Sequence, residues 1–176
     1  MPNWCHNLLS VEGDEKQLKK FRKDTKTKET ELSMGTILPC PQELEDTKSP
    51  VTDNVLARTN KKKYGEVDWY HWNIQNWGTK WDLREVYLGS KDKTCIEYEY
   101  ETAWSPNTDF FRNISEKYPK LRFVLDYYEP GCMFEGMFIV ENGKIEEDEE
   151  HDLPTEKCKK CKEQYIIREG ECWNCS

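Results

Sequence analysis

Long apolar runs and alanine are both scarce in this chain of 176 residues. No stretch of about 18 apolar residues exists, so no membrane span is expected. Only Ala57 and Ala103 represent alanine, the strongest helix former, and a large helical bundle is therefore not expected. The N-terminal segment lacks a basic region followed by an apolar stretch, which predicts no signal peptide and a cytoplasmic location.

Aliphatic side chains are also few, because Leu, Ile, Val and Phe together make up only 33 of the 176 residues. A fraction below about 20% favours disorder when the net charge is high. Aromatic residues offset this deficit, with 7 Trp, 9 Tyr and 6 Phe. Because each buries roughly 150–250 Å² on folding, the composition predicts a folded domain.

The net charge of −8 is concentrated in one segment. Residues 141–156 carry a net charge of −7, whereas residues 1–140 carry −3 and residues 157–176 carry +2. Residues 146–156 show no apolar period, and such acidic blocks repel themselves and stay extended. They are interpreted as a linker between domains at 1–145 and 157–176, with an interaction tail or nucleic-acid mimic as the alternative.

Alternating apolar and polar residues predict strands at 4–11, 94–102, 121–128 and 133–140. A further strand is predicted at 34–38, and the polar residues 42–63 are interpreted as an insertion loop. Helices are expected after Asp14 as a cap, after Ser105 as a cap with Pro106 at the first helical position, and along a stripe of Tyr70, Ile74, Trp77 and Trp81 that Gly78 would end. Asn142-Gly143 predicts a tight hairpin turn. This order predicts an α+β domain with a mostly antiparallel sheet and helices on one face.

Two CxxC pairs near the C-terminus carry the most specific chemical signal. Each pair can supply two ligands to a zinc ion from a tight turn. The two pairs together complete the tetrahedron around one ion through Cys158, Cys161, Cys172 and Cys175. With four cysteine ligands no position stays open for water, so the expected cofactor is one structural Zn²⁺ in a zinc ribbon at 157–176. Two disulfides or a redox pair are the alternatives. The other cysteines are interpreted as small buried hydrophobes.

Five motifs in order resemble the YubB-like family over roughly residues 1–140. They are Pro2-Asn3-Trp4-Cys5-x-Asn7, Leu38-Pro39-x-Pro41, Trp77-Gly78-Thr79-Lys80-Trp81-Asp82, Thr102-Ala103-Trp104-Ser105-Pro106 and Tyr128-Glu129-Pro130-Gly131-x-x-Phe134-x-Gly136. The resemblance implies a ferredoxin-like α+β domain encoded on plasmids, prophages or pathogenicity islands. It implies no activity, and the cysteine ribbon lies outside the common domain.

The aromatic motifs supply the candidate binding residues, which are Trp72, Trp77, Lys80, Trp81, Asp82, Trp104 and Glu129. An exposed rim is expected around Trp72, Trp81 and Trp104, because tryptophan is enriched at interface hot spots. A cleft with acid–base chemistry from Lys80, Asp82 and Glu129, together with His71, is the enzymatic alternative. No nucleophile–base spacing or phosphate-binding glycine loop supports an enzyme, so no catalytic residue is assigned.

The favoured function is a non-enzymatic binding protein with a host or phage protein as its partner. The resemblance implies a mobile-element protein that modulates a host defence or regulatory factor in the host cytoplasm. Single-stranded nucleic acid is the other candidate partner, because Arg58, Lys61, Lys62 and Lys63 precede an aromatic segment. The net negative charge of residues 1–140 disfavours it.

Overall fold

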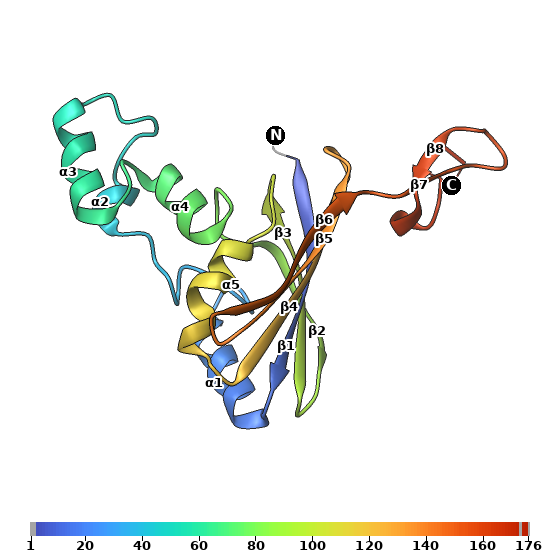
Figure 1. The fold of residues 1–176 in the computed structure, drawn as a ribbon, viewed down its shortest axis with the longest axis horizontal. Helices are drawn as coiled ribbons and strands as arrows, with labels where there is room; N and C mark the ends of the chain where they lie inside the picture. Colours follow the sequence, from blue (N-terminus) through green and yellow to red (C-terminus); the bar gives the residue numbers. More distant parts are fainter. Residues whose placement is uncertain (1–2, 173, 176) are drawn as a thin grey trace.

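A six-stranded antiparallel sheet forms the main body of the computed structural model, which describes residues 3–172 and 174–175 (Figure 1). Its strands follow the spatial order β2-β3-β1-β4-β5-β6. The bounds are β1 Trp4–Gly13, β2 Arg84–Lys91, β3 Cys95–Ala103, β4 Leu121–Glu129, β5 Phe134–Glu141 and β6 Lys144–Asp152. Pro2, in the first motif, lies outside the described residues.

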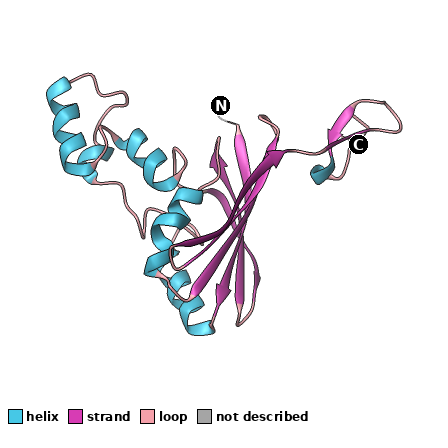
Figure 2. Cartoon of the chain, viewed as in Figure 1, coloured by secondary structure: helices cyan, strands magenta, loops and turns pink. Residues whose placement is uncertain are grey.

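Helices α1 to α5 lie on one side of this sheet (Figure 2). Helix α1 connects β1 to the segment that leads to β2, and α5 connects β3 to β4, which gives the βαββαβ order of a ferredoxin-like fold. Strands β5 and β6 extend the sheet beyond β4. The helical bounds are α1 Glu15–Thr25, α2 Gln42–Glu45, α3 Asn54–Tyr64, α4 Trp69–Trp77, α5 Thr108–Ile114 and η1 Ser115–Lys117.

The core lies between the helices and the covered face of the sheet. Strands β1, β3 and β4 alternate buried residues with residues that are mostly half-buried, as their sequence pattern predicts. Phe123 of β4 is fully buried and packs against the rings of Phe21 and Phe111, with ring centroids 5.5 and 5.3 Å away. These contacts bring α1 and α5 onto the same strand.

Several local predictions hold. Asp14 caps α1 by accepting hydrogen bonds from the N–H groups of Lys16 and Gln17. Gly78 ends α4 in the left-handed conformation. Asn142 and Gly143 connect β5 to β6 with φ values of 47° and 75°, the geometry that a tight type I′ hairpin requires.

Three other predictions are wrong. Residues 34–38 form turns, because Met34 and Gly35 donate their backbone N–H groups to Asp82 rather than to a neighbouring strand. The expected loop at 42–63 contains α2 and α3. Helix α5 begins at Thr108, so Ser105 does not cap it; the Ser105 hydroxyl instead donates to the carbonyl of Gly78 at 2.6 Å.

The expected linker at 146–156 is also wrong over most of its length, because residues 146–152 lie in β6 and pair with β5. Two arginines reduce the repulsion that the acidic sequence implies. Arg122 contacts Glu146 at 2.9 Å, and Arg112 contacts Asp148 at 3.2 Å. The carboxylates line an outer strand, where charge discourages pairing with other chains. The division into two domains stays a prediction.

A small hairpin follows the sheet. Strand β7, Thr155–Lys157, pairs with β8, Gln164–Ile166, and a short helix η2, Ile167–Glu169, comes next. This C-terminal ribbon extends from the end of β6 (Figure 1). No helix among the described residues is both long and apolar enough to cross a membrane.

Candidate metal centre and binding surface

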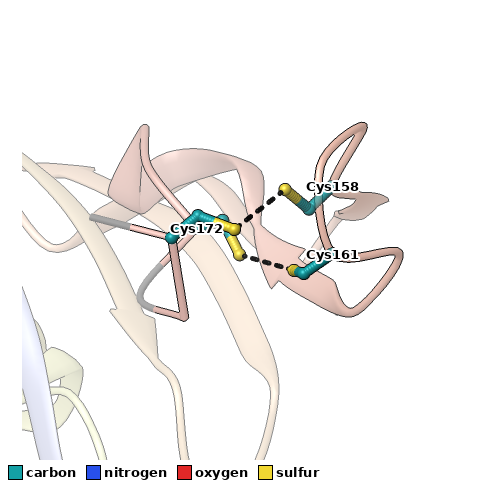
Figure 3. Close-up of side chains that lie close together, drawn as sticks. Cys158, Cys161 and Cys172 are labelled. Carbon is teal, nitrogen blue, oxygen red and sulfur yellow. Dashed lines mark hydrogen bonds between the residues drawn. The ribbon is translucent and has the colours of Figure 1, made fainter.

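The four cysteines of the CxxC pairs come together in the C-terminal ribbon. Cys158 and Cys161 lie between β7 and β8, and Cys172 and Cys175 follow η2. Their sulfur atoms all lie within 4.8 Å of one another. Figure 3 shows the side chains of Cys158, Cys161 and Cys172 with their sulfur atoms directed toward one another. The four side chains therefore form a possible metal site.

The sulfur spacing fits a tetrahedral metal ion. The Sγ atoms of Cys158 and Cys175 are 3.8 Å apart, and those of Cys161 and Cys172 are 3.5 Å apart. Sulfurs about 2.3 Å from a zinc ion would stand about 3.8 Å apart at the corners of a tetrahedron. A disulfide requires about 2.05 Å, and all eight cysteines carry free thiols in this structure.

Backbone N–H groups beside the cluster favour the thiolate form of Cys158, the form that binds a metal. The N–H groups of Cys161 and Lys160 lower the pKa of the Cys158 thiol to about 6. Burial, by contrast, raises the pKa of Cys172. A thiolate is the form that binds a metal, so the turn at Cys158 favours the ligating state before any ion arrives.

The remaining cysteines do not join such a cluster among the described residues. Burial raises the pKa of both Cys5 and Cys40 to about 12, so these two thiols stay protonated and pack as apolar groups. Cys95 is half-buried at the start of β3, and Cys132 is exposed in the β4–β5 turn. The interpretation as small hydrophobes therefore fits Cys5 and Cys40 best.

Three tryptophans from separate parts of the chain form a second feature, which we call the indole surface: Trp4, Trp81 and Trp104. The rings of Trp4 and Trp81 are 6.4 Å apart and tilted by 37°, and those of Trp81 and Trp104 are 6.1 Å apart and tilted by 32°. Trp81 is 41% exposed and Trp104 is 40% exposed. Trp81, the middle ring, and Trp104 therefore present large apolar faces to solvent.

Two cations accompany these rings. The Lys80 Nζ lies 4.4 Å from the ring centroid of Trp81 and 5.2 Å from that of Trp104. It also lies 5.7 Å from the ring of Tyr70. Arg84 lies over Trp4 at 4.6 Å. Each such cation–π contact is worth about 0.5–1 kcal/mol at an exposed site, so together they fix the orientation of the indoles.

The backbone at Trp104 is strained. Trp104 has a φ of 69°, in the left-handed region that bulky side chains avoid. Its N–H group donates to the carbonyl of Asn3 at 3.0 Å, which holds this conformation. Such strain costs about 1–3 kcal/mol and is concentrated at functional sites in proteins.

Two candidate acidic residues have their oxygens occupied by local hydrogen bonds. The Asp82 carboxylate accepts from the Ser33 hydroxyl and from the N–H groups of Met34, Gly35 and Leu83. These bonds fix the loop that precedes α2.

Glu129 is buried and accepts from the N–H groups of Gly131 and Cys132. His71 lies apart from both acids and contacts the buried Asp68 at 2.7 Å. Both carboxylates thus support loops, and this geometry does not favour acid–base chemistry at Lys80.

Trp72 and Trp77 belong to the core. They are only 7% and 5% exposed, with their rings 5.8 Å apart, and the Trp77 indole N–H donates to the carbonyl of Leu38. The expectation that Trp72 lies on an exposed rim is therefore wrong. Of the predicted stripe, helix α4 buries Trp77, while Tyr70 and Ile74 are half-buried and the helix ends before Trp81. Its other buried residues, Trp72 and Asn73, lie outside that stripe.

Sequence reasoning did not identify Trp4 and Arg84 as part of this surface. Trp4 pairs with Ala103, the neighbour of Trp104, in the β1–β3 register, and Arg84 begins β2 opposite Glu101. Only the strand pairing brings them beside Trp81. A cross-strand alignment of the aromatic motifs is the signal that would have found Trp4.

Comparisons with known proteins agree with this fold. The model of the family described as "Ferredoxin-like domain in Api92-like protein" matches residues 76–166, just over half of the chain. A crystal structure of protein api92 from Yersinia pseudotuberculosis superposes with a TM-score of 0.56 at 9% identity. It covers 86% of this chain and 98% of that one, and at such identity the likeness concerns the fold alone. No curated protein matches. The chain belongs to the family of Api92-like proteins with a ferredoxin-like domain.

Proposed function

We propose that this Api92-like protein is a non-enzymatic binding protein of a mobile element, which engages and modulates a host defence or regulatory protein through the indole surface. The mobile-element setting follows from the resemblance to the YubB-like family. The observation that carries the binding role is the exposure of two neighbouring indoles, Trp81 at 41% and Trp104 at 40%. We expect the protein to act in the cytoplasm of the host.

Keeping these rings exposed lowers the stability of the fold in two ways. Two indoles face water instead of filling the core, and Trp104 adopts a strained backbone. Lys80 and Arg84 then hold the rings in place. Preorganised aromatic side chains lose little entropy on binding, and tryptophan is enriched among hot spots of protein interfaces. A protein partner would bury the apolar faces and offset these costs.

Removing the indoles while leaving the sheet intact tests this role. Tagged wild type and the variant Trp81→Ala/Trp104→Ala are used to capture partners from host extract, with and without nuclease treatment. We expect a host protein that wild type retains in both arms and the double variant loses. Leu56→Ala is the matched control, because Leu56 is 42% exposed on α3. Equal capture by wild type and the double variant would refute the proposal.

Single-stranded nucleic acid is the second candidate ligand, which the cations Lys80 and Arg84 beside the indoles favour. Bases stack on exposed aromatic rings, and cations track the phosphates. Titration with oligonucleotides at low and physiological salt separates the candidates. Micromolar binding at physiological salt that Trp81→Ala/Trp104→Ala abolishes would promote nucleic acid to the main ligand. Binding that disappears at physiological salt would leave the protein partner as the expectation.

For the ribbon, we propose one structural Zn²⁺ ion held by Cys158, Cys161, Cys172 and Cys175. Four thiolates leave no open coordination position, so the ion would order the ribbon without acting on a substrate. The sulfur spacing of 3.5 and 3.8 Å and the preference of soft thiolates for zinc support this assignment.

A further inference from the structure

The face of the sheet opposite the helices carries two adjoining hollows. One, of about 280 Å³, lies over β1 to β4, and the other, of about 220 Å³, lies over β4 to β6. Arg168 of the ribbon lines both hollows. We call the two together the acidic trough, after the carboxylates that line it: Glu85, Glu99, Glu101, Asp126, Glu135, Glu147 and Glu149.

Arg168 shows how the trough holds a guanidinium group. Its Nη2 contacts the Asp126 carboxylate, and its Nη1 contacts the Glu135 carboxylate at 3.0 Å. The guanidinium carbon lies 5.0 Å from the ring centroid of Tyr128. Tyr128 is itself held by stacking on His6, with ring centroids 4.8 Å apart. The two carboxylates and the ring thus recognise both the charge and the planar shape of arginine.

The trough has more negative charge than Arg168 neutralises. Among the described residues, neither Glu99 nor Glu147 lies within 4.0 Å of a lysine, arginine or histidine nitrogen. Arg168 is also the only lysine or arginine among the residues that line the two hollows. Arg84 contacts Glu85 and Glu101 at one edge of the trough, and Arg168 occupies its centre. The carboxylates of Glu99 and Glu147 that remain make the face complementary to a partner with several positive charges.

We propose that the acidic trough is a docking surface for an arginine-rich segment of a partner protein, and that Arg168 of the ribbon occupies its central position in cis. The partner segment displaces Arg168, places its own guanidinium between Asp126 and Glu135 over Tyr128, and extends toward Glu99 and Glu147. The ribbon then competes with the partner from a short distance, which lowers the apparent affinity of the full chain. This surface adjoins the indole surface, because Arg84, which lies over Trp4, also contacts Glu85 and Glu101 of the trough, but the proposal does not depend on the indoles.

Fluorescence anisotropy with labelled oligoarginine and oligolysine peptides tests the proposal on the full chain at physiological salt. We expect Arg168→Ala to tighten oligoarginine binding about tenfold, because it removes a competitor held by two charge-assisted hydrogen bonds. Lys159→Ala is the matched control: it removes the same charge from an exposed position of the ribbon. We expect it to leave the affinity almost unchanged.

A second pair of variants locates the peptide. In the Arg168→Ala background, Asp126→Asn should weaken oligoarginine binding, whereas Glu29→Gln, at an exposed position away from the trough, should not. Tyr128→Leu should remove the preference for oligoarginine over oligolysine. The proposal is overturned if Lys159→Ala tightens binding as much as Arg168→Ala does, or if wild type and Arg168→Ala bind both peptides equally.

Discussion

The sheet domain and the C-terminal ribbon are stabilised in different ways. The sheet domain buries a continuous core of aromatic and aliphatic side chains, among them Phe21, Phe111 and Phe123. Among its described residues, the ribbon contributes none to that core, and the buried hydrophobic residues there are two of the clustered cysteines, Cys158 and Cys172. One region thus gains its stability from the hydrophobic effect, while the other depends on a few polar contacts and on its sulfur cluster.

This difference implies that the two regions respond to different perturbations. A segment of about 20 residues cannot bury enough apolar surface to offset the entropy of ordering, at roughly 1.5 kcal/mol per residue. The ribbon therefore needs another source of stability, whereas the sheet does not. Perturbing the metal should affect the ribbon alone, and perturbing the core should affect the sheet first.

Removing the metal should have the largest effect. If zinc holds the ribbon, Cys172→Ser or a strong chelator removes a contribution of about 10–16 kcal/mol and unfolds the ribbon. Elemental analysis should fall from one zinc ion per chain toward none. Amide NMR signals of β7 and β8 should lose their dispersion while signals of β1 to β5 persist.

Cys95→Ser serves as the control, because Cys95 is a half-buried free thiol outside the cluster. Its zinc content should equal that of wild type. Wild type isolated without zinc, with the four sulfurs in two disulfides, would contradict the metal assignment.

A cavity in the core should have the next largest effect. Phe123→Ala removes a fully buried ring that packs on Phe21 and Phe111, and such substitutions cost about 3–5 kcal/mol. Urea unfolding followed by far-UV circular dichroism should show a lower midpoint. Tyr87→Ala, at a position that is 62% exposed on β2, should leave the midpoint nearly unchanged. Loss of zinc from folded Phe123→Ala would show that the two regions are coupled.

The same contrast explains which features the sequence could predict. Strands β1, β3 and β4 can be predicted from the sequence because alternation is a local pattern and one face of each strand is buried. The cysteine cluster can also be predicted, because the short spacing between the two cysteines of each CxxC pair is itself the signal for a metal site.

Other features depend on contacts that the local pattern does not contain. The sequence of β6 predicts a linker because its acidic residues mask its pairing with β5, and Arg122 and Arg112 come from elsewhere in the chain. The apolar residues at 34–38 mimic a strand, but Asp82, more than forty residues further along the sequence, holds them in turns. The indole surface likewise needs the β1–β3 register to bring Trp4 beside Trp81.

Loss of the Asp82 carboxylate should have a smaller effect than the core cavity. Asp82→Asn keeps the size of the side chain but weakens its hydrogen bonds to Ser33, Met34 and Gly35, at about 1–3 kcal/mol. We expect a lower urea midpoint and unchanged zinc content. Asp46→Asn, at an exposed position after α2, is the matched control. An unchanged midpoint for Asp82→Asn would reopen a chemical role for this carboxylate.

The contact between the two regions should matter least for stability. The Arg168 side chain is 30% exposed and those of its partners Asp126 and Glu135 are 31% and 24% exposed, and partly exposed ion pairs contribute about 0–1 kcal/mol. Arg168→Ala should therefore leave the free energy of unfolding of the sheet, measured by urea titration, within about 1 kcal/mol of wild type while it releases the ribbon from the trough. Backbone ¹⁵N relaxation should then report faster independent motion for β7 and β8 with the same zinc content. A double-mutant cycle of Arg168→Ala with Asp126→Asn measures the interaction free energy of this ion pair, since both regions stay folded in each variant. A large loss of sheet stability would mean that the ribbon is part of the fold of the domain, and the comparison between two separately stabilised regions would fail.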